Sequence, residues 1–168
     1  MLGLLLALAC PVSHAVDIDP DLRATVQVDP LTFALGYAHV QVELALADRW
    51  SLYAGPHLRL FDAIGSTEHE PYRGYGVELG VRRYLTGEAP EGAWVLTRGV
   101  FALAHTDTPT PPTAPAGYGS VLAGYTGIFH SGLVLSGGAG VQYIHYTVGG
   151  YGVDGVFPAA HTAIGWAF

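Results

Sequence analysis

The chain has 168 residues, about the length of one domain, and half of them are hydrophobic while only 12% are charged. This composition excludes an intrinsically disordered chain, and a net charge of −7, with seven scattered arginines and no lysine, argues against nucleic-acid binding. Charged or polar residues interrupt every hydrophobic region after the N-terminus, so no segment there is predicted to cross a membrane as a helix.

The first fifteen residues are predicted to be a signal peptide. An apolar run over 2–10 is followed by Ser13 and Ala15, small residues at the positions that signal peptidase prefers. Cleavage after Ala15 leaves 16–168 as one domain and removes Cys10, the single cysteine of the chain. In an alternative interpretation Cys10 is the acylated residue of a lipoprotein, although the residues before it fit that pattern poorly.

The remaining chain is predicted to be all-β, because hydrophobic residues alternate with small or polar ones. In the segment 40–46, Val40, Val42 and Leu44 share one face and Gln41 and Glu43 share the other. Glycine and proline clusters separate such segments at regular intervals. Eight strands are predicted, at 24–36, 38–46, 50–61, 73–86, 93–105, 118–129, 133–146 and 157–168.

The fifth predicted strand, 93–105, departs from simple alternation. Arg98 shares its parity with Trp94 and Leu96, which would place a charge on an apolar face. We therefore expect a β-bulge or a local change of face in this strand.

The connections between the predicted strands alternate in length. Three are short and three are long: 47–49, 87–92 and 130–132 against 62–72, 106–117 and 147–156. Short turns on one side, long loops on the other and an even strand number are typical of outer-membrane β-barrels. The strands also reach the length that a tilted strand needs to cross a bilayer. The predicted fold is an eight-stranded antiparallel up-and-down transmembrane β-barrel, monomeric, with both termini periplasmic.

Aromatic residues are predicted to mark the two rims of this barrel, since Trp and Tyr favour membrane interfaces. Tryptophans are expected at the periplasmic rim and tyrosines near the opposite rim: Trp50, Trp94 and Trp166 against Tyr37, Tyr75, Tyr118 and Tyr146. Only two acidic residues fall within the alternating strand segments, and both lie on the inward face.

A known group of proteins shares these features. The stretch DPLTFALGYAHVQVELALADRWSLYAGP, the export signal, the eight alternating segments and the aromatic last strand resemble the small OmpA/OmpX-like outer-membrane barrels of Gram-negative bacteria. They resemble most closely a family of uncharacterised outer-membrane proteins whose N-terminal hairpin carries a Glu before a short turn and a Ser-bearing strand after it. The resemblance implies an outer-membrane location and a structural or surface-interaction role, without catalysis or cofactor.

The interior of an eight-stranded barrel is just filled by side chains. We predict that inward polar residues form a lumen network in which carboxylates meet guanidinium groups: Glu43, His57, Arg59, Glu78, Arg82 and Gln142. Its expected role is structural, because buried charges must be paired, and the alternative is a gated proton or ion path. His39 and His57 are expected to face each other across strands, but the histidines show no metal-ligand spacing.

Two further functions remain open at this point. Some small barrels deacylate lipid A with a His and a Ser two residues apart at the outer, lipid-facing rim, and with a nearby acid. His130 and Ser131 are adjacent and lie in a periplasmic turn, so they do not fit, while His105 and His145 lie near the outer rim and could serve as bases. The other function is that of a soluble exported barrel enclosing a small apolar ligand, which would need a polar outer face.

The last strand, 157–168, is predicted to close the barrel against the first. Ile164, Trp166 and Phe168 form an outward row, and a terminal Phe after such a row resembles the signal read by the bacterial barrel-assembly machinery. The expected partners are therefore this machinery and outer-membrane lipid.

Overall fold

The computed structural model describes residues 22–60, 72–106 and 113–168. The predicted signal peptide at 1–15, nearly all of the predicted connection 62–72 and half of the connection 106–117 lie outside these residues. No helix in the described part of the chain is long and apolar enough to cross a membrane.

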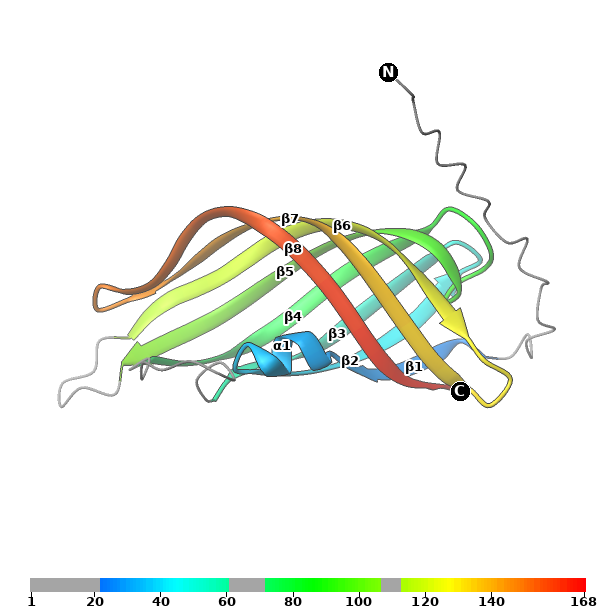
Figure 1. The fold of residues 1–168 in the computed structure, drawn as a ribbon, viewed down its shortest axis with the longest axis horizontal. Coiled ribbons are helices and arrows are strands. Elements are labelled where there is room, and N and C mark those ends of the chain that lie inside the picture. The colour runs from blue at the N-terminus through cyan, green and yellow to red at the C-terminus, as the bar shows by residue number, and fades with distance from the viewer. Residues whose placement is uncertain (1–21, 61–71, 107–112) are drawn as a thin grey trace, which may run out of the picture.

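The described residues form a closed barrel of eight antiparallel strands, each paired with its sequence neighbours, and β8 pairs with β1 (Figure 1). This confirms the predicted eight-stranded up-and-down barrel. One short helix, α1 (Pro30–Ala34), separates the first two strands. The strands are β1 (Ala24–Val28), β2 (Tyr37–Ala47), β3 (Trp50–Arg59), β4 (Tyr72–Tyr84), β5 (Gly92–Thr106), β6 (Thr113–Ile128), β7 (Leu133–Val148) and β8 (Tyr151–Ala167).

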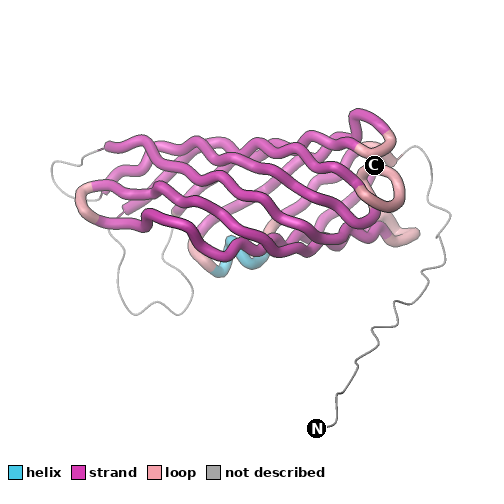
Figure 2. The backbone as a smooth tube through the Cα atoms, turned by 90° about the horizontal axis from the view of Figure 1, so that it is seen from above, coloured by secondary structure: helices cyan, strands magenta, loops and turns pink. Residues whose placement is uncertain are grey.

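The two ends of the barrel differ. The connections 48–49, 85–91 and 129–132 lie at one end, here called the turn end, together with the C-terminus (Figures 1 and 2). The other end, here called the loop end, contains the β7–β8 turn and the two points where the described chain is interrupted, between 60 and 72 and between 106 and 113. This division agrees with the predicted placement of the short connections.

The predicted long connection 147–156 is wrong. β7 continues to Val148 and β8 begins at Tyr151, so only Gly149 and Gly150 form the turn. Both glycines have positive φ, 60° and 87°, as a two-residue hairpin turn requires. The glycine-rich sequence here forms a tight turn and the first residues of β8, which sequence inspection took for a loop.

The predicted strand 24–36 is also wrong in its second half. β1 ends at Val28, and Asp29 caps α1 by accepting hydrogen bonds from the backbone N–H groups of Leu31 and Thr32, over 2.9 and 3.1 Å. Pro30 occupies the first helical position, where its missing N–H has no consequence. The Asp-Pro pair is therefore a helix start.

The barrel is apolar outside, and its charged side chains are buried inside together with apolar ones. Outward residues such as Val42, Leu79 and Val121 are 43–50% exposed. Glu43 and Glu78, on the inward faces of β2 and β4, are completely buried. The two faces follow the predicted alternation, and they are arranged in the opposite way to those of a water-soluble β-barrel.

The fifth strand contains no bulge, contrary to the expectation. β5 pairs in continuous register with both neighbours, and Trp94, Leu96 and Arg98 all point inward and are buried. Simple alternation therefore assigns Arg98 to the right face, and the interior accepts apolar side chains beside charged ones. The irregularity lies instead in β2, where its register against β3 shifts between Ala45 and Ala47.

The aromatic residues also depart from their predicted rim positions, because the interior accepts apolar side chains. Trp50 and Trp166 are outward and nearly half exposed, but Trp94 is completely buried inside the barrel. Among the tyrosines predicted at the opposite rim, Tyr75 is outward, whereas Tyr146 is buried among inward rings that include Tyr37. Tyr118 packs inside as well, against His57. Aromatic residues at strand ends thus serve both the interior and the outer surface.

Trp94 occupies space that two glycines leave free. A Cβ atom on Gly124 or Gly138 would lie 2.4 Å from the indole ring, too close for a real contact. The indole Nε1 donates to Thr126 Oγ1 over 2.9 Å, which fixes the ring. The tryptophan and the two glycines therefore form one packing unit across β5, β6 and β7.

We predict that Gly124→Ala lowers the free energy of unfolding by about 1–3 kcal/mol, because the new methyl group overpacks the interior against Trp94 and against the Gly137 carbonyl oxygen. Gly127→Ala on the same strand is the control, since its Cβ would meet nothing closer than 3.9 Å. Urea titration followed by tryptophan fluorescence measures both variants. Equal stabilities of the two variants would contradict the packing account.

Candidate functional site

The candidate site is the set of buried polar side chains inside the barrel. Of the predicted network, Glu43, His57, Arg59, Glu78 and Arg82 are at most 3% exposed. Gln142 points inward but is only half-buried. The hydrogen bonds form two centres inside the barrel, each built around one carboxylate. The predicted residues outside these two centres lie closer to the loop end.

Glu43 is the first centre. Arg82 Nη1 donates to its Oε2 over 2.7 Å in a fully buried ion pair. Tyr84 Oη and Ser51 Oγ donate to its Oε1 over 2.8 and 2.5 Å. Gln27 Nε2 donates to its Oε2 over 3.2 Å. Strands β1, β2, β3 and β4 are thereby joined through one carboxylate.

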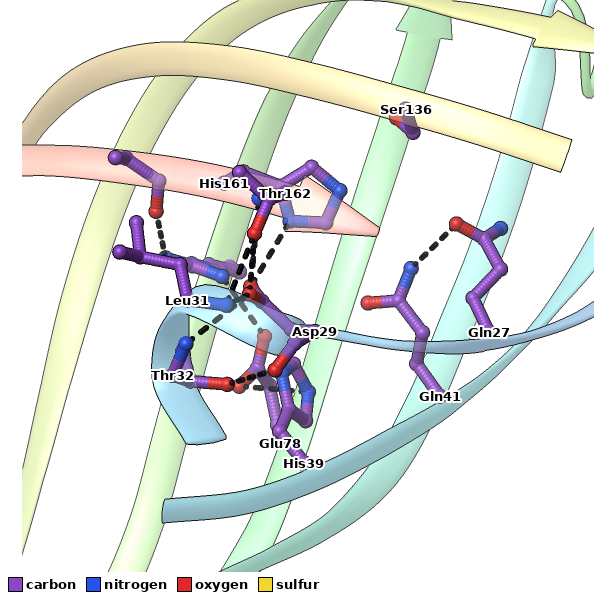
Figure 3. Close-up of polar contacts among 12 residues, drawn as sticks. Gln27, Asp29, Leu31, Thr32, His39, Gln41, Glu78, Ser136, His161 and Thr162 are labelled. Atoms are coloured by element: carbon purple, nitrogen blue, oxygen red, sulfur yellow. Dashed lines mark hydrogen bonds and ion pairs between the residues drawn. The ribbon is translucent and has the colours of Figure 1, made fainter. Parts of the chain in front are cut away.

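Glu78 is the second centre. Tyr53 Oη donates to its Oε1 over 2.5 Å and Tyr118 Oη to its Oε2 over 3.0 Å. His39 Nε2 lies 3.2 Å from Oε2 (Figure 3). Arg98 Nη1 lies 3.4 Å from Oε1. This carboxylate joins β2, β3, β5 and β6 to its own strand β4.

The two arginines have further partners. The guanidinium of Arg82 stacks on Trp94, 4.4 Å from the ring centroid, and its Nη2 lies 3.3 Å from His161 Nε2. Arg98 Nε donates to Ser120 Oγ over 2.8 Å. Each carboxylate therefore meets one guanidinium, and each guanidinium is held by neighbours on other strands.

Asp29 forms a third polar contact, where β1 ends. Thr162 donates to Asp29 Oδ1 through its hydroxyl over 2.7 Å and to Oδ2 through its backbone N–H over 3.4 Å. His161 Nδ1 lies 3.9 Å from the same Oδ2 (Figure 3). The carboxylate that caps α1 thus also attaches the helix to β8.

The other predicted residues lie among aromatic rings. Arg59 stacks on Tyr72 and Tyr37, 4.2 and 5.1 Å from the ring centroids. The ring centroid of His57 lies 5.0 Å from that of Tyr37 and 6.1 Å from that of Tyr146. Elsewhere in the interior, Gln142 Nε2 donates to the backbone carbonyl of Pro158 over 3.2 Å.

Sequence reasoning missed several partners of the carboxylates. Arg98 was left out because its parity conflicted with that of Trp94, although inward placement was one solution. Tyr118 was assigned to a rim, and Tyr53 was not singled out on the polar face of its strand. For Ser51 and Gln27, period-two alternation was the available signal, and it gives the face but not the partner.

Metal ligation was considered for the histidines. His39 and His57 are register partners on β2 and β3, as expected. In the described part of the chain, no group of three or more His, Cys, Asp or Glu side chains is placed to hold a metal ion.

The outer surface carries one polar pair that the sequence did not single out. His145 of β7 and Asp154 of β8 are register partners, and His145 Nδ1 contacts Asp154 Oδ2. Thr147 follows on the same face of β7. His145 and Thr147 line a groove of about 610 Å³, mostly bounded by apolar or small residues of β5, β6 and β7. His130 and Ser131 lie apart from it, at the turn end.

We predict that Arg82→Met lowers the free energy of unfolding by about 3–5 kcal/mol, because it leaves the buried Glu43 carboxylate without its charge partner. Arg82→Met combined with Glu43→Gln should lose less than the single variant. Arg83→Met, at the neighbouring exposed position, is the control. Urea titration measures the three variants, and similar losses in Arg82→Met and Arg83→Met would contradict the role of the ion pair.

Comparisons with known proteins identify no relative. No protein-family model matches the chain. No curated protein and no solved structure matches it either. Function is therefore inferred from the residues and their geometry.

Proposed function

We propose that the chain is a monomeric outer-membrane β-barrel of the OmpA/OmpX-like type with a structural or surface-interaction role. The observation that carries this proposal is the reversed polarity of the barrel, with charged side chains buried inside and apolar side chains outside. Such a surface costs little in a bilayer and a great deal in water.

The outward apolar surface has a suitable height. On β5 it runs from Val95 to Leu103, with Phe101 69% exposed between them. Eight residue steps span about 26 Å along a strand and about 20 Å along the axis of a barrel with strands tilted by roughly 40°. This approaches the apolar band of about 25 Å in outer-membrane barrels.

The filled interior favours a structural role over transport. Tyr53, Trp94, Leu96 and Leu122 belong to one buried cluster inside the barrel. Each of the two carboxylate centres is paired with an arginine, so the buried charges neutralise each other inside the barrel. An ion or proton path would have to disrupt these contacts.

The rims and the C-terminus support the same orientation. Outward Trp50 lies beneath the Arg83 guanidinium, 5.5 Å from the ring centroid, at the turn end, which we assign to the periplasm. Ile164, Trp166 and Phe168 are 42–61% exposed on the outer surface. This exposed row is available to the barrel-assembly machinery before closure and to outer-membrane lipid afterwards.

We predict that Val121→Arg lowers the free energy of unfolding in lipid by about 2–4 kcal/mol, since Val121 lies outward near the middle of β6. Phe129→Arg, at the turn end, should lose no more than about 1 kcal/mol. Folded and unfolded chains are separated by their gel mobility before and after boiling, across a urea series in phosphatidylcholine vesicles.

A water-soluble barrel would behave differently under the same substitutions. An arginine on a water-exposed surface is nearly neutral for stability, so Val121→Arg would match Phe129→Arg. A detergent-free soluble monomer, or equal effects of the two substitutions, would reject the membrane proposal and favour the exported ligand-binding barrel.

The His145–Asp154 pair favours a second candidate function, hydrolysis of lipid esters at the outer rim. A carboxylate that orients a histidine is the base arrangement used to activate a hydroxyl nucleophile, and Thr147 is the hydroxyl on the same face. The described contacts do not join Thr147 to His145, so the nucleophile would meet its base only with substrate in the groove.

We expect His145→Ala and Thr147→Ala to abolish any such hydrolysis, because each removes one member of the catalytic set. Lipid A from cells expressing the wild-type chain, each variant or no chain would be compared by mass spectrometry. The matched control is Thr97→Ala, at an exposed threonine of β5 that does not line the groove. An acyl pattern that is identical in all strains would reject this candidate.

A further inference from the structure

Phe101 forms a ridge on the outer surface of the barrel. Its side chain lies on the outer face of β5 and is 69% exposed. A groove lies on each side of it, one of about 340 Å³ where β4 meets β5 and one of about 610 Å³ over β6. Phe101 lines both, so a single aromatic side chain separates two grooves of the outer surface.

The smaller groove is apolar. Tyr75 and Val77 of β4 and Leu103 of β5 line it, and these outward side chains are 42–53% exposed. Tyr75 and Leu103 are register partners, as are Val77 and Phe101. The groove therefore follows the line along which β4 pairs with β5, within the apolar surface that we assign to lipid.

The larger groove is open above two glycines. Gly99 of β5 and Gly119 of β6 are register partners, and both line the groove. A Cβ atom would meet nothing closer than 3.7 Å at Gly99 and 3.9 Å at Gly119, so packing inside the barrel does not require a glycine at either position. Their effect is on the outer surface, where they leave a hollow between Phe101 and Tyr143.

Polar side chains lie at the loop end of the smaller groove. Arg73 and His105 are register partners on the outer faces of β4 and β5, and they follow Tyr75 and Leu103 toward the loop end. The His105 ring centroid lies 6.4 Å from that of Tyr75, which lines the groove. Arg73 Nη1 donates to the Tyr72 carbonyl over 3.1 Å, and the five N–H donors of a guanidinium serve several acceptors at once. A cation and an imidazole thus border an apolar groove.

Asp154, which lies near the larger groove, already has a partner. His145 lines this groove, and its Nδ1 contacts Asp154 Oδ2. Arg73 lies on the other side of Phe101 from this pair, at the end of the smaller groove. An anionic head group is therefore expected near Arg73, where the charge is complementary, and not near Asp154.

We propose that one phosphorylated lipid binds here, with one acyl chain in each groove, Phe101 between the chains and the phosphate at Arg73 and His105. Phosphate oxygens accept charge-assisted hydrogen bonds from a guanidinium, and a neutral imidazole also carries one N–H donor. Neighbouring strands lie about 4.8 Å apart, so grooves on opposite sides of β5 are close enough for two chains of one molecule. This lipid site rests on the membrane location proposed above, because acyl chains reach the outer surface only in a bilayer.

The probe is dimyristoyl phosphatidic acid, titrated into the full chain folded in detergent micelles, with bound lipid counted by native mass spectrometry. We expect one molecule to bind saturably. Dimyristoyl phosphatidylcholine has the same chains and a head group without net charge, and myristoyl lysophosphatidic acid has the same phosphate and one chain. Each should bind about ten-fold more weakly, because the first lacks the net negative charge and the second leaves a groove unfilled.

Gly119→Leu tests the larger groove. It fills the hollow with a side chain whose Cβ has room on the barrel, and it should weaken phosphatidic acid binding about ten-fold. Gly127→Leu is the control, since Gly127 lies on the outer face of the same strand outside both grooves and its Cβ would also meet nothing closer than 3.9 Å. Binding of lysophosphatidic acid, whose one chain can use the smaller groove, should change less.

Arg73→Gln tests the head group. It should reduce the preference for phosphatidic acid over phosphatidylcholine about ten-fold. Arg83→Gln, at an exposed arginine near the turn end of the same strand, should keep that preference. Equal binding of the three lipids, or unchanged binding in both Gly119→Leu and Arg73→Gln, would overturn the proposal. A dimer that excludes lipid would also overturn it, because the grooves would then hold a second copy of the chain.

The gel-mobility assay for folding is run on every sample, so a failed barrel is not mistaken for a failed lipid site. A chain that is a soluble monomer without detergent rejects the membrane location and the lipid site together. A barrel that folds in lipid but binds no phosphatidic acid rejects the lipid site alone. None of the variants alters His145 or Thr147, so the result does not depend on hydrolysis of lipid esters.

Discussion

Two buried carboxylates, Glu43 and Glu78, organise the interior of the barrel. A charge inside a narrow barrel is stable only when counter-charges and hydrogen-bond donors surround it. The required arginine, tyrosine and serine side chains come from strands β3 to β6, and β1 and β2 add a glutamine and a histidine, so these strands must hold a fixed register. These charges are thereby kept off the outer surface, and this distribution supports the proposed location in lipid. The proposed location and the internal packing thus depend on the same contacts.

Much of the fold could be predicted because its main signal is local. Period-two alternation identifies strands and assigns each side chain to a face, and it placed Glu43, Glu78 and Arg82 inside the barrel as observed. Short connections fix the pairing of neighbouring strands, so antiparallel order follows from chain order. Neither inference requires knowledge of which side chains meet across the barrel.

The features that were missed depend on three-dimensional packing or on short backbone motifs. Burial of Trp94 depends on glycines from two neighbouring strands, which no single segment reveals. Helix α1 begins at an Asp-Pro pair inside an otherwise strand-like segment, so alternation was followed too far. The tyrosine and histidine partners of Glu78 come from distant strands, and period two predicts their face without predicting their contact.

The shortness of β1 also has a mechanical consequence. β7 and β8 pair along their whole length, whereas β1 pairs with the chain end and β8 only from Ala24 to Val28. The junction between β1 and β8 therefore has few backbone hydrogen bonds, and we expect the barrel to open there first. Asp29 strengthens this junction by accepting a hydrogen bond from Thr162 at the point where strand pairing stops. Backbone hydrogen bonds thus join β1 to β8 up to Val28, and the side chain of Asp29 makes the next contact between the two segments.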